Sequence, residues 1–371
     1  MEFALDDEQQ ALQATVREVL TDRAPSSYVR AMVDDQAGVS DDQAGVSDEL
    51  WATMVELGWV GLLVPERHGG AGRTLLEMMV VLEEMGRLPL PGPFLSSAVL
   101  ATSAAARLGL TDRLAALAAG TTRGTVAVDE DGHGDVVDRI RTRASRRSGQ
   151  WRLTGTKSVV LDGQSADWVL VAARTQQGIG TFAIEAPRAE PMAGLDVTRR
   201  LSRLELVDVP AVAVGPDGDH TAIWKRVVDD GAVALCAETL GSMEQAFDLA
   251  VEYAKVRVQF DRPIATFQAI KHKAAEMLER IELSRVGVHY AAWTSAADEP
   301  NRAEAAAMAK AFVGRAGNEV CGEAIQIHGG VGFTWECDAH LHYRRAKAND
   351  LLLGYSGTWL HKVADSYLAT G

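Results

Sequence analysis

The sequence predicts an α+β protein whose helices and strands occupy separate stretches of the chain. Three observations support this prediction. Both ends show helical periodicity, the middle contains short segments rich in β-branched and aromatic residues, and turn residues separate those segments. This order is typical of segregated layers rather than of alternating βα units. Because 371 residues are too many for one small core, we expect three domains, at 1–121, 122–223 and 224–371.

The first region, residues 1–121, is predicted to be helical because Leu5, Leu12, Val16 and Leu20 recur at helical spacing. Within it, the heptapeptide DDQAGVS occurs twice in tandem, at 34–40 and 41–47. Two polar copies do not make a solenoid, so we interpret them as a duplication in a surface loop. The serine that ends the second copy is a suitable N-cap for a following helix.

The middle region, residues 122–223, is predicted to form antiparallel strands. Its apolar segments are TVAV at 125–128, WRLTG at 151–155, KSVVL at 157–161 and WVLVAA at 168–173. Turn residues, as in LDGQSAD at 161–167, separate them. In the last region, residues 224–371, three long helical patterns predict a helical bundle.

The composition excludes several classes of partner. A net charge of −14 repels nucleic-acid phosphates and anionic membranes, and an anionic substrate would need a local basic pocket. We expect no membrane insertion, because no run of about 18 apolar residues is present and the acidic start MEFALDDEQQ lacks the apolar core of a signal peptide. Cys236, Cys321 and Cys337 have no CxxC spacing, which indicates a reducing compartment. We therefore expect a cytoplasmic protein.

Two short motifs lie in the helical C-terminal region. The first reads RVQF at 257–260, PI at 263–264 and FQ at 267–268, and the second reads AIQIHGGVGFTWE at 324–336. Both resemble signatures of the acyl-CoA dehydrogenase family, and the order of regions resembles that family over nearly the whole chain. In the family, these two segments belong to one subunit and hold the adenosine diphosphate (ADP) half of an FAD that is bound mainly by the neighbouring subunit.

The resemblance implies an N-terminal helical domain, a middle antiparallel β domain and a C-terminal four-helix bundle. It also implies an FAD cofactor shared at a subunit interface. The residues of this chain that would contact it are Arg257, Phe260, Gln268, Gln326, Gly329 and Gly330.

The residue types suit this role. Arg257 can bind a pyrophosphate through two parallel hydrogen bonds, and Gln268 and Gln326 offer amide groups. Gly329 and Gly330 let backbone N–H groups approach a phosphate closely. Taken alone, an arginine is usually a solvated surface residue and a Gly-Gly pair usually a helix end. The joint occurrence in family order favours FAD.

Two features depart from a standard nucleotide site. Asp261 stands where the family usually has glycine, and it adds a negative charge near the pyrophosphate. The glycines at 329, 330 and 332 are not a Rossmann fingerprint, because a helical pattern rather than a strand precedes them.

Three histidines in this region, His328, His340 and His342, raise the question of a metal. Their spacing matches no helical zinc motif and no acidic residue completes a ligand set, so we predict no metal site. We interpret them as two surface histidines on a helix and one in a loop.

The resemblance also indicates that the catalytic base is missing. In the family a Glu removes the α-proton of the thioester while a hydride leaves the β-carbon for flavin N5. Ser356 stands at its commonest position, and a serine hydroxyl has far too weak a proton affinity for this role. Gly231 stands at the second position known in the family. Its neighbours Asp229 and Asp230 are candidates for a displaced base, although paired exposed acids at a helix start more often complement the helix dipole.

The segments that would contact the flavin ring are altered as well. The family's T-E-P-x-x-G-S-D strand reads VDEDGHGD at 128–135. The family's next strand, K-x-W-I-[ST]-N-G, reads KSVVLDG at 157–163, with Val159 at the tryptophan and Leu161 at the hydroxyl. An aromatic platform and its polar partner are therefore lost together. The preserved LTGTK before this strand and ADWVLVAART after it support the alignment.

We therefore predict a non-catalytic subunit that completes the FAD site of a catalytic acyl-CoA dehydrogenase subunit and meets an acyl-CoA substrate only through the complex. Heteromeric α2β2 enzymes of this kind occur in actinobacterial steroid side-chain degradation, which is our hint to the substrate. Two alternatives remain open: a homomeric dehydrogenase or oxidase with an atypical base such as Asp230, and a non-enzymatic acyl-thioester-binding scaffold.

Overall fold

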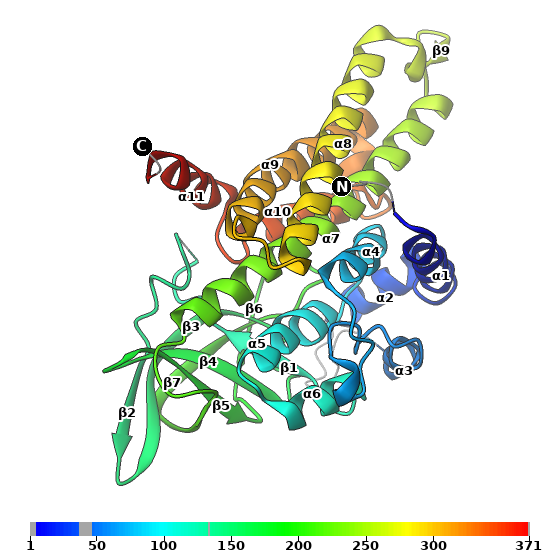
Figure 1. The fold of residues 1–371 in the computed structure, drawn as a ribbon. Coiled ribbons are helices and arrows are strands. Elements are labelled where there is room, and N and C mark those ends of the chain that lie inside the picture. Colours follow the sequence, from blue (N-terminus) through cyan, green and yellow to red (C-terminus); the bar gives the residue numbers. More distant parts are fainter. Residues whose placement is uncertain (1–4, 37–46, 133, 370–371) are drawn as a thin grey trace.

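A computed structural model of the chain describes residues 5–36, 47–132 and 134–369. Helices form both ends of the chain and a sheet forms its middle, in the order predicted from the sequence, and the sheet lies to one side of the helices (Figure 1). Most of the tandem repeat lies outside the described residues, so its interpretation as a loop stays a prediction. Its last residue, Ser47, is the predicted N-cap, since its hydroxyl accepts a hydrogen bond from the Leu50 N–H at 3.2 Å.

The N-terminal region is helical throughout its regular elements. These are α1 (Asp7–Arg23), α2 (Ser26–Gln36), α3 (Asp48–Glu56), the 3₁₀ helix η1 (Glu66–His68), α4 (Leu75–Gly86), the π-helix η2 (Leu95–Ala101), α5 (Thr102–Arg107) and α6 (Thr111–Ala118).

The middle region is a seven-stranded sheet. Its strands are β1 (Gly124–Ala127), β2 (Arg143–Arg147), β3 (Gln150–Leu161), β4 (Trp168–Thr175), β5 (Gly178–Glu185), β6 (Glu190–Met192) and β7 (Leu201–Val214). The strand order is β1-β4-β2-β3-β7-β5, and β4 also pairs with β5, so the sheet curls back on itself as a barrel. The two segments expected at 151–155 and 157–161 form one continuous strand, β3.

The sheet is not purely antiparallel, contrary to the expectation. β1 runs parallel to β4, and β2 meets β4 in a parallel pairing at one position, while the other pairs are antiparallel. The β2–β3 hairpin reverses the chain once and the turn between Leu161 and Trp168 reverses it again, so that β4 runs in the direction of β1. Strand propensity does not predict the parallel pairing, because the direction of β4 relative to β1 depends on the connections between the strands.

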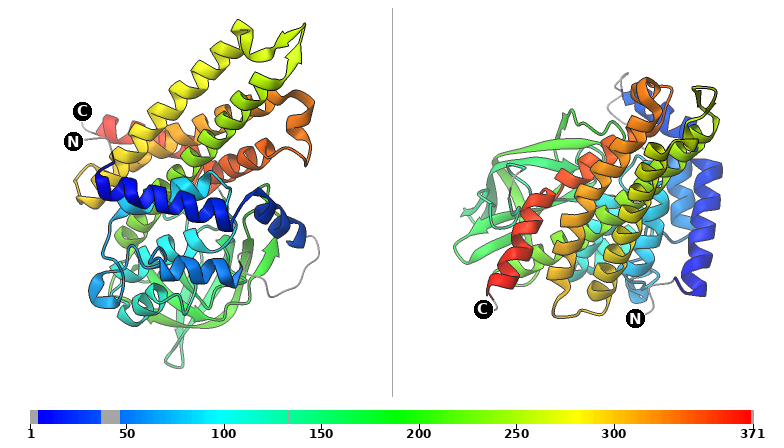
Figure 2. Two further views of the ribbon diagram at one scale, coloured as in Figure 1. Left: turned by 90° about the vertical axis from the view of Figure 1, so that its right-hand side faces the viewer. Right: turned by 90° about the horizontal axis from the view of Figure 1, so that it is seen from above.

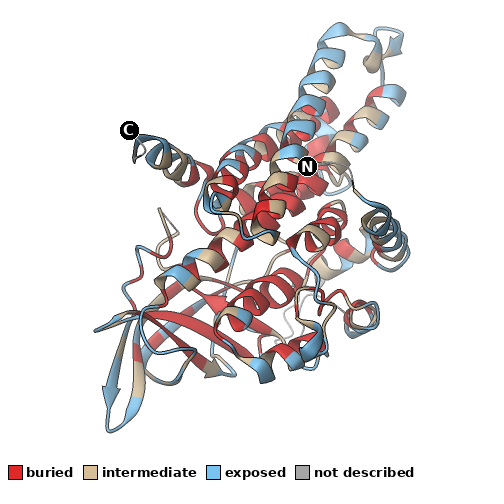
Figure 3. Ribbon diagram, in the orientation of Figure 1, coloured by how far each residue is buried: buried red, intermediate tan, exposed pale blue. Residues whose placement is uncertain are grey.

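The C-terminal region consists of α7 (Thr221–Val256), α8 (Gln268–Ala296), α9 (Arg302–His328), the 3₁₀ helix η4 (Gly329–Phe333), α10 (Ala339–Leu351) and α11 (Ser356–Ala369). Between α7 and α8 lie the two-residue strands β8 (Val258–Gln259) and β9 (Arg262–Pro263) and the 3₁₀ helix η3 (Ile264–Thr266). α7 starts beside the sheet and, with α8, projects beyond the rest of the molecule to the β8–β9 tip (Figure 2). The projecting part is largely exposed (Figure 3). In the described part of the chain, no helix is long and apolar enough to cross a membrane.

A close helix crossing joins the first and last regions. A Cβ added at Gly86 of α4 would lie 2.0 Å from the Glu238 carbonyl oxygen, and one added at Gly241 of α7 would lie 1.8 Å from the Glu83 carbonyl oxygen. Only glycine permits this approach of the two backbones. The Ser242 hydroxyl then donates to the Gly86 carbonyl at 2.9 Å. α7 is therefore held firmly against the N-terminal helices.

The predicted domain limits stay a prediction. Helix gives way to strand between Ala118 and Gly124, and strand gives way to helix between Val214 and Thr221. These changes fall near the expected positions, but the core does not separate there: α7 and β1 both contribute to the main hydrophobic cluster.

Candidate functional site

The first family motif forms the tip of the α7–α8 projection. Arg257 follows the last residue of α7, and Gln268 is the first residue of α8. Between them, Phe260 and Asp261 link β8 to β9 with φ angles of +51° and +62°. A two-residue hairpin loop with two positive φ values favours glycine, asparagine or aspartate. Asp261, the departure from the family pattern, is thus one of the residues that best tolerates this turn.

The second motif forms the end of α9. Gln326 lies in the last turn of this helix, and its carbonyl accepts a hydrogen bond from the Gly329 N–H. Gly329 has a φ of +63°, and a Cβ at either Gly329 or Gly330 would meet no atom within 4 Å. The backbone here is therefore open to an approaching group, as a phosphate site requires.

A stacked pair of aromatic rings brings the two motifs together. Tyr253, one turn before Arg257, stacks on His328 with ring centroids 4.6 Å apart. The Nδ1 atom of His328 lies 2.8 Å from the Ala324 carbonyl oxygen. The stack holds the end of α7 against the end of α9, so the motifs share one side of the bundle. The chain contacts expected at 257–268 and 326–330 are thus neighbours in space.

The interpretation of the three histidines as two surface residues on a helix and one loop residue is wrong, because all three are buried residues of helices. His328, His340 and His342 are 7%, 6% and 2% exposed. His328 is the last residue of α9 and forms the stack with Tyr253. His340 and His342 are buried residues of α10, and burial lowers the pKa of His342 to about 4. The sequence did not reveal this burial, because a histidine is polar and is expected at the surface. The residues that cover these histidines come from elements distant in the sequence. Among the described residues, no group of three or more His, Cys, Asp or Glu side chains could hold a metal.

The candidate ADP-side residues face outward. The six of them are exposed, and Phe260 retains 87% of its surface. The Arg257 side chain forms no ion pair within the described part of the chain. In the second motif, Phe333 and Trp335 are 77% and 56% exposed. Exposed cationic and apolar side chains such as these are suited to contact with another molecule. The residues present therefore fit the ADP half of FAD, although the role of each stays a prediction.

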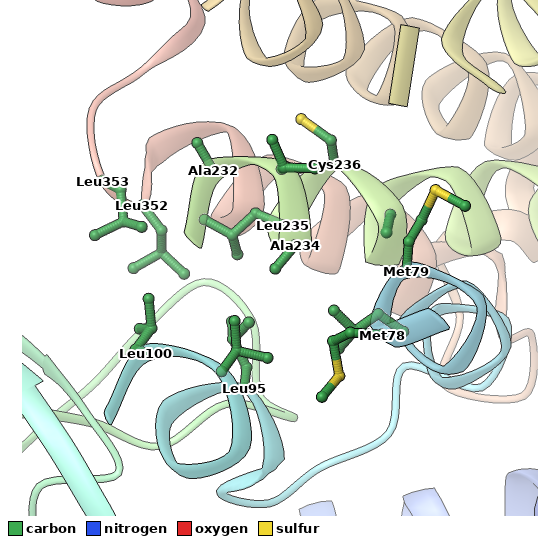
Figure 4. Packing of buried hydrophobic residues seen from close by; sticks show 14 of the residues in the cluster. Met78, Met79, Leu95, Leu100, Ala232, Ala234, Leu235, Cys236, Leu352 and Leu353 are labelled. Carbon is green, nitrogen blue, oxygen red and sulfur yellow. The ribbon is translucent and has the colours of Figure 1, made fainter. Parts of the chain in front are cut away.

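The predicted ring-side residues converge on a different place, between η2, the sheet and α7. Val128, Asp129, Val159 and Leu161 from the two altered strands meet Leu353 of the loop before α11, and the cavity among them measures about 20 Å³. Its other lining residues are Leu100, Val126 and Leu352. Leu100 of η2 faces Leu352 and Leu353 directly beneath α7 (Figure 4).

This cavity is of water size, whereas ligand pockets usually measure about 300–1,000 Å³. Its single carboxyl group, Asp129, accepts hydrogen bonds from the N–H groups of Gly132 at 2.8 Å and Asp131 at 3.2 Å. Burial raises the pKa of Asp129, and those hydrogen bonds oppose the shift. The residues around the cavity therefore do not fit a flavin ring.

Of the two predicted base positions, Gly231 lies against residues that line this cavity, whereas Ser356 is the first residue of α11. The Ser356 N–H donates to Asp350 at 2.9 Å, and the residue is 7% exposed. A Cβ added at Gly231 would lie 2.5 Å from Leu100 Cδ2 and 2.7 Å from Leu353 Cδ1. Leucine side chains thus occupy the space into which a carboxylate at 231 would project.

The expectation that Asp229 and Asp230 are exposed acids at a helix start is wrong. Both lie inside α7, as its ninth and tenth residues, and Asp230 is 7% exposed. The Asp230 carboxylate pairs with Arg107 at 2.8 Å and Arg226 at 3.4 Å. Hydroxyl groups of Ser103 and Ser295 also donate to it, at 3.1 and 2.8 Å. A carboxylate with four partners is a structural anion rather than a free base.

The structure adds residues that the sequence reasoning missed. Leu100, Leu352 and Leu353 close the ring-side cavity, yet in the sequence they are ordinary apolar residues. One signal was available for the last two: they directly precede the altered turn at 354–357. For Leu100 there was none, because only the fold brings η2 to α7.

Comparison with known proteins agrees with this fold. Residues 6–112 match the family model of the acyl-CoA dehydrogenase N-terminal domain, and residues 221–368 match that of the acyl-CoA dehydrogenase C-terminal domain. The chain is 31% identical to the acyl-CoA dehydrogenase IpdE2 of Mycolicibacterium smegmatis, covering 94% of this chain and 96% of IpdE2. This chain belongs to the acyl-CoA dehydrogenase family.

One further relative is longer than this chain, and two solved structures share its fold. The acyl-CoA dehydrogenase FadE34 of Mycobacterium tuberculosis is 34% identical over 98% of this chain, which spans only 48% of FadE34. A variant of the Tcur3481–Tcur3483 steroid ACAD has a TM-score of 0.87 and 30% identity over 98% of this chain and 99% of its own. The ChsE4–ChsE5 complex from Mycobacterium tuberculosis has a TM-score of 0.87 and 27% identity, covering 99% of each chain. The predicted family and fold class are confirmed.

Proposed function

We propose that this chain is a supporting subunit of a flavin-dependent acyl-CoA dehydrogenase and that it completes the FAD site of a catalytic partner. The observation that carries the proposal is the absence of a carboxyl side chain at 231 and 356, the two base positions, together with a cavity of only about 20 Å³ next to Gly231. A subunit without room for the ring or a base cannot run the reaction alone. The exposed ADP-side residues are what such a subunit would keep.

The proposed partner is a second acyl-CoA dehydrogenase subunit. Two similar structures are described as a two-component steroid ACAD and a two-component complex, which makes a heterotetramer and a steroid side-chain thioester the first assembly and substrate to test. The matching segment makes up 48% of FadE34, so that protein contains a further stretch of about equal length. We place the complex in the cytoplasm, in keeping with three unpaired cysteines.

When bound, FAD supplies the acceptor for the hydride from the thioester's β-carbon. The proposed task of this chain is to bind and orient the far end of that cofactor. The Arg257 guanidinium would donate two hydrogen bonds to the pyrophosphate. Gln268 and Gln326 would hydrogen-bond the adenosine side, and the open backbone at Gly329 and Gly330 would donate N–H groups.

The yellow colour of bound flavin in the purified protein distinguishes this proposal from the alternatives. The chain expressed alone should hold little FAD and should not dehydrogenate acyl-CoA thioesters, while co-expression with the partner should yield a yellow, active complex. Stoichiometric flavin and turnover in the chain alone would instead support a homomeric enzyme. A colourless product under both conditions would support a scaffold without cofactor.

A substitution tests the ADP-side role directly. Arg257→Ala should weaken FAD binding to the deflavinated complex by about 10- to 150-fold, since a charge-assisted contact is worth roughly 1.5–3 kcal/mol. Raising free FAD should restore occupancy by mass action. Arg262→Ala is the matched control, because Arg262 lies in the same hairpin with its guanidinium 4.2 Å from the Phe267 ring centroid. Equal FAD affinities of the two variants in a flavin-fluorescence titration would remove Arg257 from the site.

A further inference from the structure

A second concave site lies at the mouth of the β barrel, away from the residues discussed so far. It is a groove of about 830 Å³ between the β2–β3 hairpin, the end of β5 and the wall of β7. β5 and β7 pair only through Thr181–Ala183 and Val212–Val214. Beyond this short pairing, 184–186 and 209–211 line the groove rather than pairing with each other. Its volume is that of a small-molecule pocket.

The floor of the groove is the apolar interior of the barrel. Leu204 and Leu206 are 3% and 1% exposed and belong to the barrel's own hydrophobic cluster. Trp151 packs edge-on against Phe182 with centroids 5.2 Å apart. Small side chains such as Ala211 line the wall and leave the space above Trp151 open. These surfaces favour an apolar occupant.

An added β-strand is not a suitable occupant. The β7 wall contains Pro210, which has no N–H to donate, and Asp208 with a φ of +54°. The β3–β7 register also shifts between Leu206 and Val209. Proline and bulges are devices that prevent strand addition at an edge. The groove therefore fits the side of a small molecule better than an extended peptide.

The charges at the rim favour an anionic end group. Arg188 lines the groove and forms no ion pair with a described residue. Arg146 lies opposite Trp151 in the hairpin register, so both side chains share one face, and its Nε donates to the Gly149 carbonyl at 3.2 Å. Glu185, which could neutralise them, is held by Arg113. Glu205 also lines the groove, but it alternates along β7 with the buried Leu204 and Leu206, so its side chain points away from the barrel interior.

We infer that this groove binds an anionic amphiphile, with an aliphatic chain on Trp151, Leu204 and Leu206 and a carboxylate at Arg188. The site is independent of the proposed flavin role. It needs no FAD and no partner subunit.

Quenching of tryptophan fluorescence by a brominated fatty acid tests this inference on the full chain. The wild type should show saturable quenching below the micellar concentration of the probe, and Trp151→Phe should lose the saturable component. Ala211→Phe should fill the groove and weaken binding by about tenfold or more. Val207→Phe is its control, because Val207 lies on the same strand, is 75% exposed and does not line the groove.

A second pair of measurements tests the head group. Arg188→Gln should weaken binding of the acid by about two- to fivefold, as expected for an exposed ion pair. It should leave binding of the matching brominated alcohol unchanged. Quenching that persists in Trp151→Phe, equal effects of Ala211→Phe and Val207→Phe, or quenching seen only with anionic lipid vesicles would each overturn the proposal. Far-ultraviolet circular dichroism of every variant confirms that the fold is kept.

Discussion

Replacing Asp230 by asparagine separates a structural anion from a catalytic base. The carboxylate is 9% exposed and contacts two guanidinium groups and two hydroxyl groups. Asp230→Asn keeps the size of the side chain and removes its charge. Arg107 and Arg226 would then face an amide, whose NH₂ group cannot accept a hydrogen bond from either.

The cost follows from burial. Removing one partner of a buried ion pair costs about 3–5 kcal/mol. The Arg107 side chain is 29% exposed, so water partly screens the charge left behind, and we expect a loss of about 2–4 kcal/mol. Asp298 is the control, since it also pairs with Arg226, at 3.3 Å, but is 77% exposed. Asp298→Asn should cost less than about 1 kcal/mol.

The assay is chemical denaturation of the full chain, followed by turnover of the complex with its partner. Asp230→Asn should lower the free energy of unfolding and leave turnover per folded complex unchanged. A double-mutant cycle with Arg107→Met should give a coupling energy of at least about 1 kcal/mol. A variant of normal stability that abolishes turnover would refute this reasoning and would restore Asp230 as a base.

Three further predictions concern the same region. Burial raises the pKa of Asp229 from 3.8 to about 7, so the folded state loses stability as the pH rises between these values. In thermal denaturation, Asp229→Asn should therefore be more stable than wild type by about 1–3 kcal/mol at pH 8 and should show no gain below pH 4. Gly231→Ala should lower the free energy of unfolding in urea by about 1–3 kcal/mol, because its Cβ would lie 2.5 Å from Leu100, and Leu100→Ala should relieve that clash. An unchanged unfolding midpoint in Gly231→Ala would show that the site has room for the added methyl group. Ser356→Glu should create no acyl-CoA dehydrogenation in the chain alone, since no hydride acceptor lies beside it; turnover in a dye-linked assay would show an intact ring site.

The ADP-side motif was predictable because it is local. Arg257, Phe260 and Gln268 are close in sequence, and a two-residue hairpin loop between two helices sets their spacing. The second motif ends a helix at a Gly-Gly pair, which is also a local signal. That the two motifs meet was known only from the family resemblance. The contact that joins them, Tyr253 on His328, is not visible in either motif.

For the residues expected beside the flavin ring, the sequence predicted only which family residues are absent. The sequence marks Val159, Leu161 and Ser356 as departures from the family pattern, but it does not say what takes up the space. Leu100 and Leu353 do so, from elements more than two hundred residues apart. The errors on the buried histidines and on Asp229 and Asp230 have the same cause. A polar residue is usually exposed, and only its partners in the fold permit its burial.

The sequence by itself determined the order of helical and β regions and the family, and it predicts the positions at which a base and a flavin platform are missing. Those properties depend on residue type and on spacing along one element. Only the tertiary structure decided that β1 and β4 run parallel, that Asp230 is held by Arg107 and Arg226, and that leucines from η2 and the loop before α11 line the cavity of about 20 Å³. These depend on long-range packing, because close packing of a core is set by which side chains meet from distant segments and not by the pattern within any one of them.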